Sequence, residues 1–152
     1  QKTLVFSQFT SFLSLIADEL DKLGIPYYTI TGATPKKERV DLVDAFNADD
    51  TPVFLVSLKA GGTGLNLTGA SVVIHADPWW NAAAQAQATD RAHRIGQTRC
   101  VSVHQVIAKG TIEERIVALQ QAKSDLADKI VGANAAPSLR LTGDELYELL
   151  QG

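Results

Sequence analysis

Two short apolar runs set the tightest limit on how this chain can fold. They are VFLVS at 53–57 and SVVIH at 71–75. A strand with water on one face alternates apolar and polar residues, whereas a strand covered on both faces is apolar almost throughout. We therefore expect these two runs to be central strands of a parallel sheet with helices on both faces.

Three further segments have the composition of strands. LVFSQ (4–8) and YYTIT (27–31) are short and rich in β-branched or aromatic residues. VSVHQVI (101–107) begins with apolar and polar residues in alternation, so we expect it nearer an edge of the sheet. Strands that alternate with helical segments indicate the α/β class, with helices on both faces of a parallel sheet.

The segments between these strands have the 3.6-residue spacing of amphipathic helices. In the helix after 27–31, Thr34 is the expected N-cap and Pro35 the first helical residue. The residues expected to form its buried stripe are Val40, Val43 and Phe46.

Two more helices are expected later in the chain. One runs from about residue 82 to 95, and a longer one follows a capping box formed by Thr111 and Glu114. The inward residues of the longer helix are expected to be Ile112, Ile116, Leu119, Leu126 and Ile130. We place the end of the domain at residue 131, with a linker at 132–141 and a short helix at 142–152.

Composition limits the class of protein more than its function. The 152 residues suffice for one domain with a core, and the 45% hydrophobic fraction is that of an ordinary globular protein. The net charge of −3 argues against binding nucleic acid through overall charge, but not against a local basic groove. The absence of methionine indicates a segment of a longer protein. Cys100, the single cysteine, excludes an internal disulfide and is expected in a buried strand.

The strand at 53–57 is followed by the glycine-rich sequence KAGGTGLNL (59–67). Open parallel sheets bind ligands beyond the carboxyl ends of their strands, and glycines let backbone N–H groups approach an anion. Neither the phosphate loop nor the dinucleotide fingerprint is complete, because Lys59 precedes the glycines and Leu67 stands where a third glycine is needed. A turn that merely reverses the chain explains the same residues.

The helix expected at 82–95 carries two arginines near its end. Gln87, Arg91 and Arg94 are spaced so that they share one helical face. An ion pair between Asp90 and Arg94 and a C-cap at Gly96 would account for part of this pattern. They leave Gln87 and Arg91 unexplained. A site that stabilises phosphate charge is therefore as good an explanation of the pattern as a solvent-exposed helix end.

Other polar and aromatic residues near strand ends have ordinary explanations. Asp77 is expected in a turn rather than as a magnesium ligand. His75 and His104 have no metal-ligand spacing and are expected to be packed or hydrogen-bonded. Trp79 and Trp80 are expected in interior or interdomain packing, with base stacking as the alternative.

Several segments resemble, in the same order, motifs of the Swi/Snf-type DNA-dependent ATPases within superfamily two of the helicases. The most specific is QATDRAHRIGQ (87–97), which with DPWWN (77–81) before it resembles motif VI. The others resemble motif IV, the segment after it, motif V and the helix that follows the core: VFSQF (5–9), TITGATPKKER (29–39), GGTGLNL (61–67) and TIEERIVALQQAK (111–123). The sequence departs from the family's pattern at Ala82, where proline is common, and at Gln85, where an acid is common.

The resemblance implies a RecA-like lobe of the P-loop NTPase type that lacks its own P-loop. In this family ATP with Mg²⁺ is bound mainly by a first lobe, N-terminal to the one seen here. Arg91 and Arg94 match the catalytic arginine fingers that reach this ATP, and Gln87, Gly62 and Gly64 would support the ATP site. The segment by itself is expected to be inactive, and the longer protein to be a DNA-dependent ATPase.

The resemblance also implies a DNA-facing surface and a set of partners. The candidates for contacts with the DNA backbone are Ser7, Gln8, Thr31, Gly32, Lys59, Thr63 and Asn66. Backbone contacts carry no sequence information, which suits a translocase that steps along any sequence. The implied partners are double-stranded DNA, the N-terminal lobe of the same protein and a protein bound to that DNA, with no membrane.

Two alternatives remain at this stage. The chain could be a non-catalytic RecA-like module that docks on DNA or protein, or the second lobe of a strand-separating helicase. The spacing of Gln87, Arg91 and Arg94 argues against the first, and DPWWN with RIGQ favours the Swi/Snf branch over the second. A short alanine-rich form favours a prokaryotic source, with a cytoplasmic, nucleoid-associated location; a eukaryotic protein would be nuclear.

Overall fold

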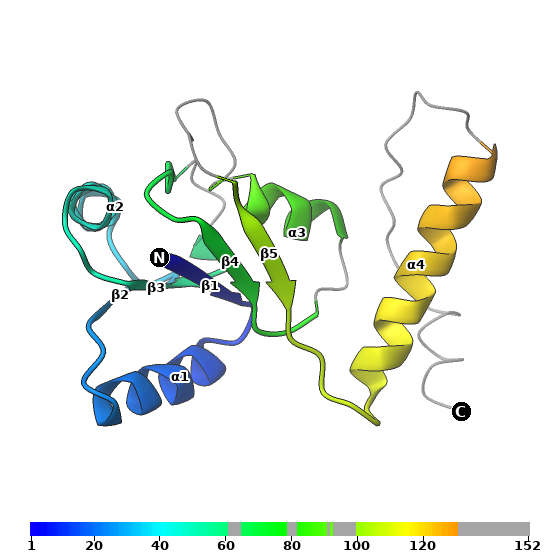
Figure 1. Cartoon of the computed structure of the whole chain (residues 1–152), viewed down its shortest axis with the longest axis horizontal. Helices are drawn as coiled ribbons and strands as arrows, with labels where there is room; N and C mark the ends of the chain where they lie inside the picture. Colours follow the sequence, from blue (N-terminus) through cyan, green and yellow to red (C-terminus); the bar gives the residue numbers. More distant parts are fainter. Residues whose placement is uncertain (61–64, 79–81, 91, 93–99, 131–152) are drawn as a thin grey trace.

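The computed structural model describes residues 1–60, 65–78, 82–90, 92 and 100–130 (Figure 1). The described residues contain one five-stranded sheet, in the order β2-β3-β1-β4-β5, in which every pairing is parallel. Its strands are β1 Thr3–Ser7, β2 Tyr27–Ile30, β3 Val53–Ser57, β4 Val72–His75 and β5 Ser102–Gln105. All five expected strands are confirmed, and β5 lies at an edge as its alternating pattern predicts.

Helices cover both faces of this sheet. They are α1 Thr10–Lys22, α2 Lys36–Ala48, α3 Ala82–Thr89 and α4 Ile112–Ile130. Because successive strand residues point to opposite faces, Phe6 packs with the α2 residue Phe46 on one face, while Val5 packs with the α1 residue Leu13 on the other. Figure 1 shows α1 on one side of the sheet and α2 and α3 on the other. The α/β fold class is confirmed.

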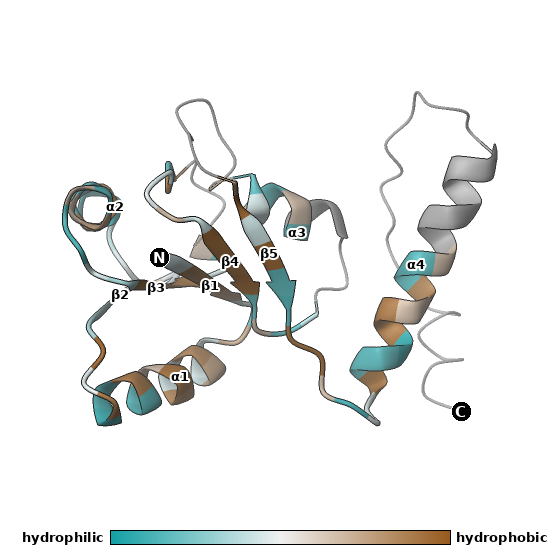
Figure 2. Ribbon diagram, in the orientation of Figure 1, coloured by the Kyte–Doolittle hydropathy of each residue, from teal (hydrophilic) through white to brown (hydrophobic). Residues whose placement is uncertain are grey.

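Hydropathy follows the same arrangement. In Figure 2 the inner strand β4 is largely brown, whereas the edge strand β5 ends in teal. Side chains at the edge are correspondingly exposed, including Val103 at 49% and His104. His104 was expected to be packed or hydrogen-bonded, and its exposure shows that it is not packed in the interior. Cys100 is also exposed and precedes β5, so the expectation of a buried strand cysteine is wrong.

The start of α2 differs from the expected pattern. Pro35 is the N-cap residue, and Thr34 instead accepts a hydrogen bond at Oγ1 from the Thr31 N–H at 3.0 Å. Val40 is 56% exposed, whereas Val43 and Phe46 are buried as expected. At about 100° per residue, position 39 lies between 43 and 46 on the helical wheel, and position 40 lies outside that arc. The buried place assigned to Val40 belongs to Arg39.

The other two helices bear out the expectation in part. A hydrogen-bonded turn follows the end of α3, from the Ala92 N–H to the Thr89 carbonyl at 3.0 Å. The expected end near Ile95 lies outside the described residues, as do the linker and the final short helix. Ile116 is buried on α4, but Ile112, which is one turn earlier at the first position of the helix, is 37% exposed. No helix among the described residues is long and apolar enough to cross a membrane.

Candidate functional site

The carboxyl ends of the parallel strands all lie along one end of the sheet, which we call the carboxyl edge to distinguish it from the lateral edge at β5. Open α/β sheets bind their ligands at this carboxyl edge. Ser7 ends β1, and Thr31, Lys59 and Asp77 follow β2, β3 and β4 closely. The sequence-predicted residues on these strand ends therefore lie along a single edge. Thr63, Gly62 and Gly64, which continue the loop after β3, lie outside the described residues.

Asp77 ties the ends of β1 and β4 together. Its Oδ2 atom accepts a hydrogen bond from the Ser7 hydroxyl, and its Oδ1 atom accepts one from the Gln8 N–H at 3.3 Å. The Gln8 side chain also donates from Nε2 to the Pro78 carbonyl at 3.2 Å. Asp77 is only 5% exposed, so its carboxylate is part of the structure's internal bonding. Asp77 therefore joins two strand ends through its carboxylate, a role that differs from the turn expected from the sequence.

Two of the predicted DNA-contact residues participate in this network. Ser7 is fully buried, with its hydroxyl bonded to Asp77 and accepting from the Phe9 N–H at 3.0 Å. Gln8 is half-buried and keeps part of its surface open to solvent. The structure therefore places Ser7 behind the surface and Gln8 on it.

Arg39 joins two loops at this edge, and the sequence interpretation missed it. Its guanidinium donates three hydrogen bonds to carbonyl oxygens: to Thr34 at 2.7 Å, to Gly32 at 3.0 Å and to Ala60 at 3.4 Å. Arg39 is 9% exposed, and the structure records no ion pair for it among the described residues. We call this set of bonds the Arg39 clamp. It connects the loop after β2 to the start of the glycine-rich loop after β3.

The signal that could have revealed Arg39 was its place on the helical wheel. Position 39 falls on the arc of α2 that Val43 and Phe46 bury, but a charged residue is assigned to the surface by default. A planar guanidinium carries five N–H donors and can bond several carbonyls at once. Burial is therefore compatible with its charge here.

Asn47, in the last turn of α2, braces the chain after the glycine-rich loop. Its Nδ2 atom donates to the Asn66 carbonyl at 2.8 Å, and its Oδ1 atom accepts from the Gly69 N–H at 3.0 Å. A Cβ atom at Gly69 would lie 2.9 Å from Asn47 Oδ1, so the close approach requires glycine. Asn66 is exposed, but it is held by the end of α2, away from Gly32 at the beginning of that helix.

The outward face of α3 carries the one described residue of the expected ATP site. Gln87 is exposed, whereas Ala88 is buried at 4% and Ala92 at 0%. The helix therefore turns its alanine side to the sheet and its Gln87 side away from it. Arg91 and Arg94 lie outside the described residues, as do Trp79 and Trp80.

His75, at the end of β4, connects the sheet to α3. Its Nε2 atom lies 3.0 Å from Thr89 Oγ1, and its ring stacks on Phe6 with 5.7 Å between ring centroids. The side chain is 1% exposed, and this burial lowers the pKa of His75 from 6.5 to about 4. The imidazole is thus neutral near pH 7. His75 was expected to be packed or hydrogen-bonded, and the structure shows both.

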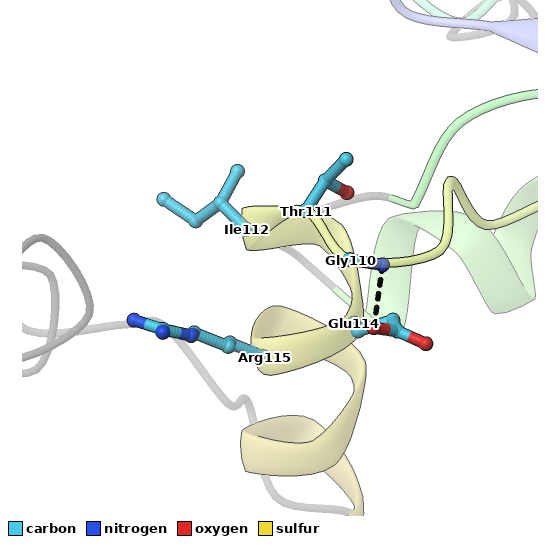
Figure 3. A pocket seen from close by; sticks show the side chains of 5 residues that line it. All are labelled: Gly110, Thr111, Ile112, Glu114 and Arg115. Carbon is cyan, nitrogen blue, oxygen red and sulfur yellow. Dashed lines mark hydrogen bonds between the residues drawn. The ribbon is translucent and has the colours of Figure 1, made fainter. Parts of the chain in front are cut away.

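A hollow at the start of α4 is lined by the residues that cap this helix. It has a volume of about 310 Å³ and is lined by Gly110, Thr111, Ile112, Glu114 and Arg115 (Figure 3). Glu114 accepts a hydrogen bond from the Gly110 N–H at 2.8 Å, and Thr111 Oγ1 accepts one from the Glu113 N–H at 3.2 Å. The expected pair of capping residues is present, with each bond shifted by one residue from the standard capping box.

Within the described ranges, no group of three or more histidine, cysteine, aspartate or glutamate residues could hold a metal ion. The exposed Gln87 face of α3 offers an amide and no acidic side chain other than Asp90. This donor set fits hydrogen bonding to a nucleotide rather than coordination of Mg²⁺.

Comparison with known proteins identifies the domain. Residues 1–96 match the family described as "Helicase conserved C-terminal domain". This chain is a helicase C-terminal domain. It belongs to the Swi/Snf-type ATPases, and the resemblance seen in its motifs is confirmed.

Relatives of this helicase C-terminal domain include proteins of bacteria and fungi. An uncharacterised ATP-dependent helicase of Mycoplasma pneumoniae is 43% identical over 99% of this chain and 15% of the relative. The putative ATP-dependent helicase/translocase YwqA of Bacillus subtilis is 46% identical over 86% of this chain and 14% of the relative. The DNA repair protein rad5 of Aspergillus fumigatus is 41% identical over 94% of this chain and 13% of the relative.

A solved structure has the same fold. The crystal structure of the C-terminal part of the Fun30 ATPase domain superposes with a TM-score of 0.76 at 39% identity, covering 91% of this chain and 44% of that one. The RecA-like architecture expected from the resemblance is therefore confirmed. The helicase C-terminal domain described here spans about 15% of the length of the first curated relatives that it matches.

Proposed function

We propose that this domain is the second motor lobe of an ATP-driven translocase on double-stranded DNA, with the first lobe supplied by the rest of a longer protein. The observation that carries the proposal is the exposed position of Gln87 on the face of α3 turned away from the sheet. Arg91 and Arg94 follow Gln87 at four and seven residues, a spacing that continues the same helical face. A ligand on another lobe can approach this face without displacing the core.

The role of the arginines follows from their chemistry. Guanidinium groups are planar, remain charged and bond phosphate oxygens through two N–H groups at once. In the proposed site Arg91 and Arg94 reach the triphosphate held by the first lobe and stabilise the charge of the transferring phosphoryl group. Gln87 orders the arginines, and the backbone N–H groups of Gly62 and Gly64 add weaker donors. Mg²⁺, held by the first lobe, would neutralise charge on the phosphates.

The DNA-facing surface is the edge where the strands end. Gln8, Thr31, Gly32, Lys59 and Thr63 are proposed to bond backbone phosphates, through backbone N–H groups, one side-chain amide, hydroxyls and one ammonium group. Asn66, which the sequence also predicted to contact DNA, is held at the opposite end of α2 and is not part of this surface. Ser7 supports this surface from behind, because its hydroxyl fixes Asp77 and so the backbone of Gln8. Contacts of this kind do not depend on base sequence, as translocation requires.

Movement would arise from alternate gripping of DNA by the two lobes. Nucleotide binding brings the Gln87 face of α3 against the first lobe, and hydrolysis releases it. The Arg39 clamp keeps the loops after β2 and β3 together, so this lobe holds DNA as a unit while it moves. The relatives named as DNA repair proteins or as a translocase support this assignment to DNA.

The test is turnover by the two-lobe protein with substitutions in the arginines. Arg91→Ala and Arg94→Ala should each reduce DNA-stimulated ATP hydrolysis by about 10³-fold or more, because finger arginines contribute at least that much in related reactions. DNA affinity, measured by fluorescence anisotropy, should stay close to that of the unmodified protein. Lys37→Ala, which removes an exposed charge from the first turn of α2, serves as the control and should leave turnover unchanged.

Normal turnover in both arginine variants would contradict the proposal. It would favour the alternative of a docking module, in which the domain binds DNA or protein without contributing to hydrolysis. Strand separation is tested in the same preparations with a forked duplex. Release of single strands that depends on ATP would favour a strand-separating helicase.

A further inference from the structure

Among the described residues, α3 packs against the sheet through small side chains, which do little to fix its rotation about its own axis. Five of the eight residues in Ala82–Thr89 are alanine, and the buried positions described on and just after this helix are Ala88 and Ala92. Helices are normally locked against a sheet by large side chains that interdigitate with it. The methyl side chain of alanine is too small to interdigitate with the sheet in this way. A more directional contact is therefore needed to set the helix.

The hydrogen bond between His75 and Thr89 is such a contact. The Thr89 hydroxyl donates to the Gln85 carbonyl at 3.2 Å within α3, so its oxygen is left to accept from His75 Nε2 at 3.0 Å. This network assigns the N–H of His75 to Nε2. The imidazole is itself immobilised, because it stacks on Phe6 of β1 and is 1% exposed.

The position of Thr89 makes this bond relevant to the outward face of α3. Gln87 and Arg91 are each two residues from Thr89, which is about 200° around the helix. Tying Thr89 to the sheet therefore turns the exposed Gln87 away from it, and Arg91 has the sequence spacing of that same face. The Asp90 N–H bonds the Ala86 carbonyl at 2.9 Å in the α-helical pattern, and the Ala92 N–H bonds the Thr89 carbonyl at 3.0 Å in a tighter turn, so the main chain just after α3 is also bonded to this helix.

We propose that the hydrogen bond between His75 and Thr89 positions the arginine fingers by setting the rotation of α3 against the sheet. His75 and Thr89 are positioning residues in this scheme, since neither touches the nucleotide. The inference rests on the proposed function of Arg91 and Arg94. It adds a connection from the interior of the sheet to that site.

The experiment compares Thr89→Val with Thr89→Ser in the two-lobe protein, under saturating DNA. Valine has nearly the shape of threonine but cannot accept the hydrogen bond, whereas serine keeps the hydroxyl. Thr89→Val should lower kcat by about 10- to 100-fold, the cost of misplacing a catalytic group by roughly 1 Å. The KM for ATP and the affinity for DNA should change little, and Thr89→Ser should restore most of the turnover.

Two further variants separate positioning from general stability and from the proposed function. Leu13→Ala creates a cavity on the opposite face of the sheet, in the core under α1, and should keep the kcat of the folded protein. Arg91→Ala tests the arginine finger itself. If Thr89→Val yields too little folded protein, Thr89→Ala replaces it, because α3 is already rich in alanine.

Each result decides one of the two ideas. Full turnover by Thr89→Val, or by Thr89→Ala where it replaces it, together with an inactive Arg91→Ala variant would show that the bond has only a structural role, and the inference would be wrong. An equal loss of kcat in Leu13→Ala would have the same meaning. Full turnover by Arg91→Ala would instead remove the proposed function, whatever the Thr89 variants do.

Discussion

Replacing Arg39 with methionine removes the guanidinium from the Arg39 clamp while keeping much of the apolar stem in place. The two shorter bonds, to Thr34 at 2.7 Å and to Gly32 at 3.0 Å, have good geometry, and the third, at 3.4 Å to Ala60, is weaker. A hydrogen bond to a charged donor contributes about 1.5 kcal/mol or more to stability. The substitution should therefore lower the free energy of unfolding by about 3 kcal/mol.

Urea denaturation of the purified domain, followed by tryptophan fluorescence, measures this loss. With a slope of about 2 kcal/mol per molar urea, the midpoint should fall by about 1.5 M. Arg39→Lys should give an intermediate result, because one ammonium group cannot reach three separated carbonyls. Lys37→Met is the matched control, since it removes an exposed positive charge two residues away. The reasoning is refuted if Arg39→Met and Lys37→Met shift the midpoint equally.

Two other predictions concern burial. The lowered pKa of His75, about 4 against 6.5 in the unfolded chain, means that below pH 6.5 the unfolded state binds a proton that the folded state does not. Stability should therefore fall between pH 6.5 and 4, by at most about 3 kcal/mol, and denaturation curves of His75→Gln should lack this component. Val40→Ala should change the free energy of unfolding by less than about 0.5 kcal/mol, whereas Val43→Ala should lower it by about 2 kcal/mol. Comparable losses in the two valine variants would contradict the corrected orientation of α2.

The strands could be predicted closely because their signal is local. The run at 53–57 matches β3 at both ends, and the alternation at 101–107 correctly placed β5 at an edge. A residue's polarity and its neighbours at a spacing of two are enough to distinguish an inner strand from an outer one. The presence of helices on both faces then followed from the need to cover apolar strands.

The contacts that hold the strand-end loops could not be predicted in the same way. Arg39 and Asn47 bond backbone atoms that are between 5 and 22 residues away in the sequence, and no local pattern records such partners. Val40 was assigned to the core because valine is apolar, although the arc of α2 that faces the sheet passes through Arg39 instead. Residue type was the misleading signal in both cases.

The family resemblance supplied what periodicity could not. Exposure of Gln87 agrees with its predicted face on α3, and membership of the helicase C-terminal family agrees with motifs read from six short segments. The burial of Ser7 was outside the reach of either approach, because its partner Asp77 is 70 residues away.

The Arg39 clamp and the Asn47 brace have a consequence for how such a surface can change. Both bond main-chain carbonyl and amide groups, so the side chains at Gly32, Thr34, Ala60 and Asn66 take no part in these bonds. Gly69 is the exception, because a Cβ atom there would collide with Asn47. The shape of these loops is thus largely independent of the chemistry they display. In a domain built this way, the side chains that the loops present to DNA can change, over evolution or by design, while the main-chain bonds that hold the loops stay the same.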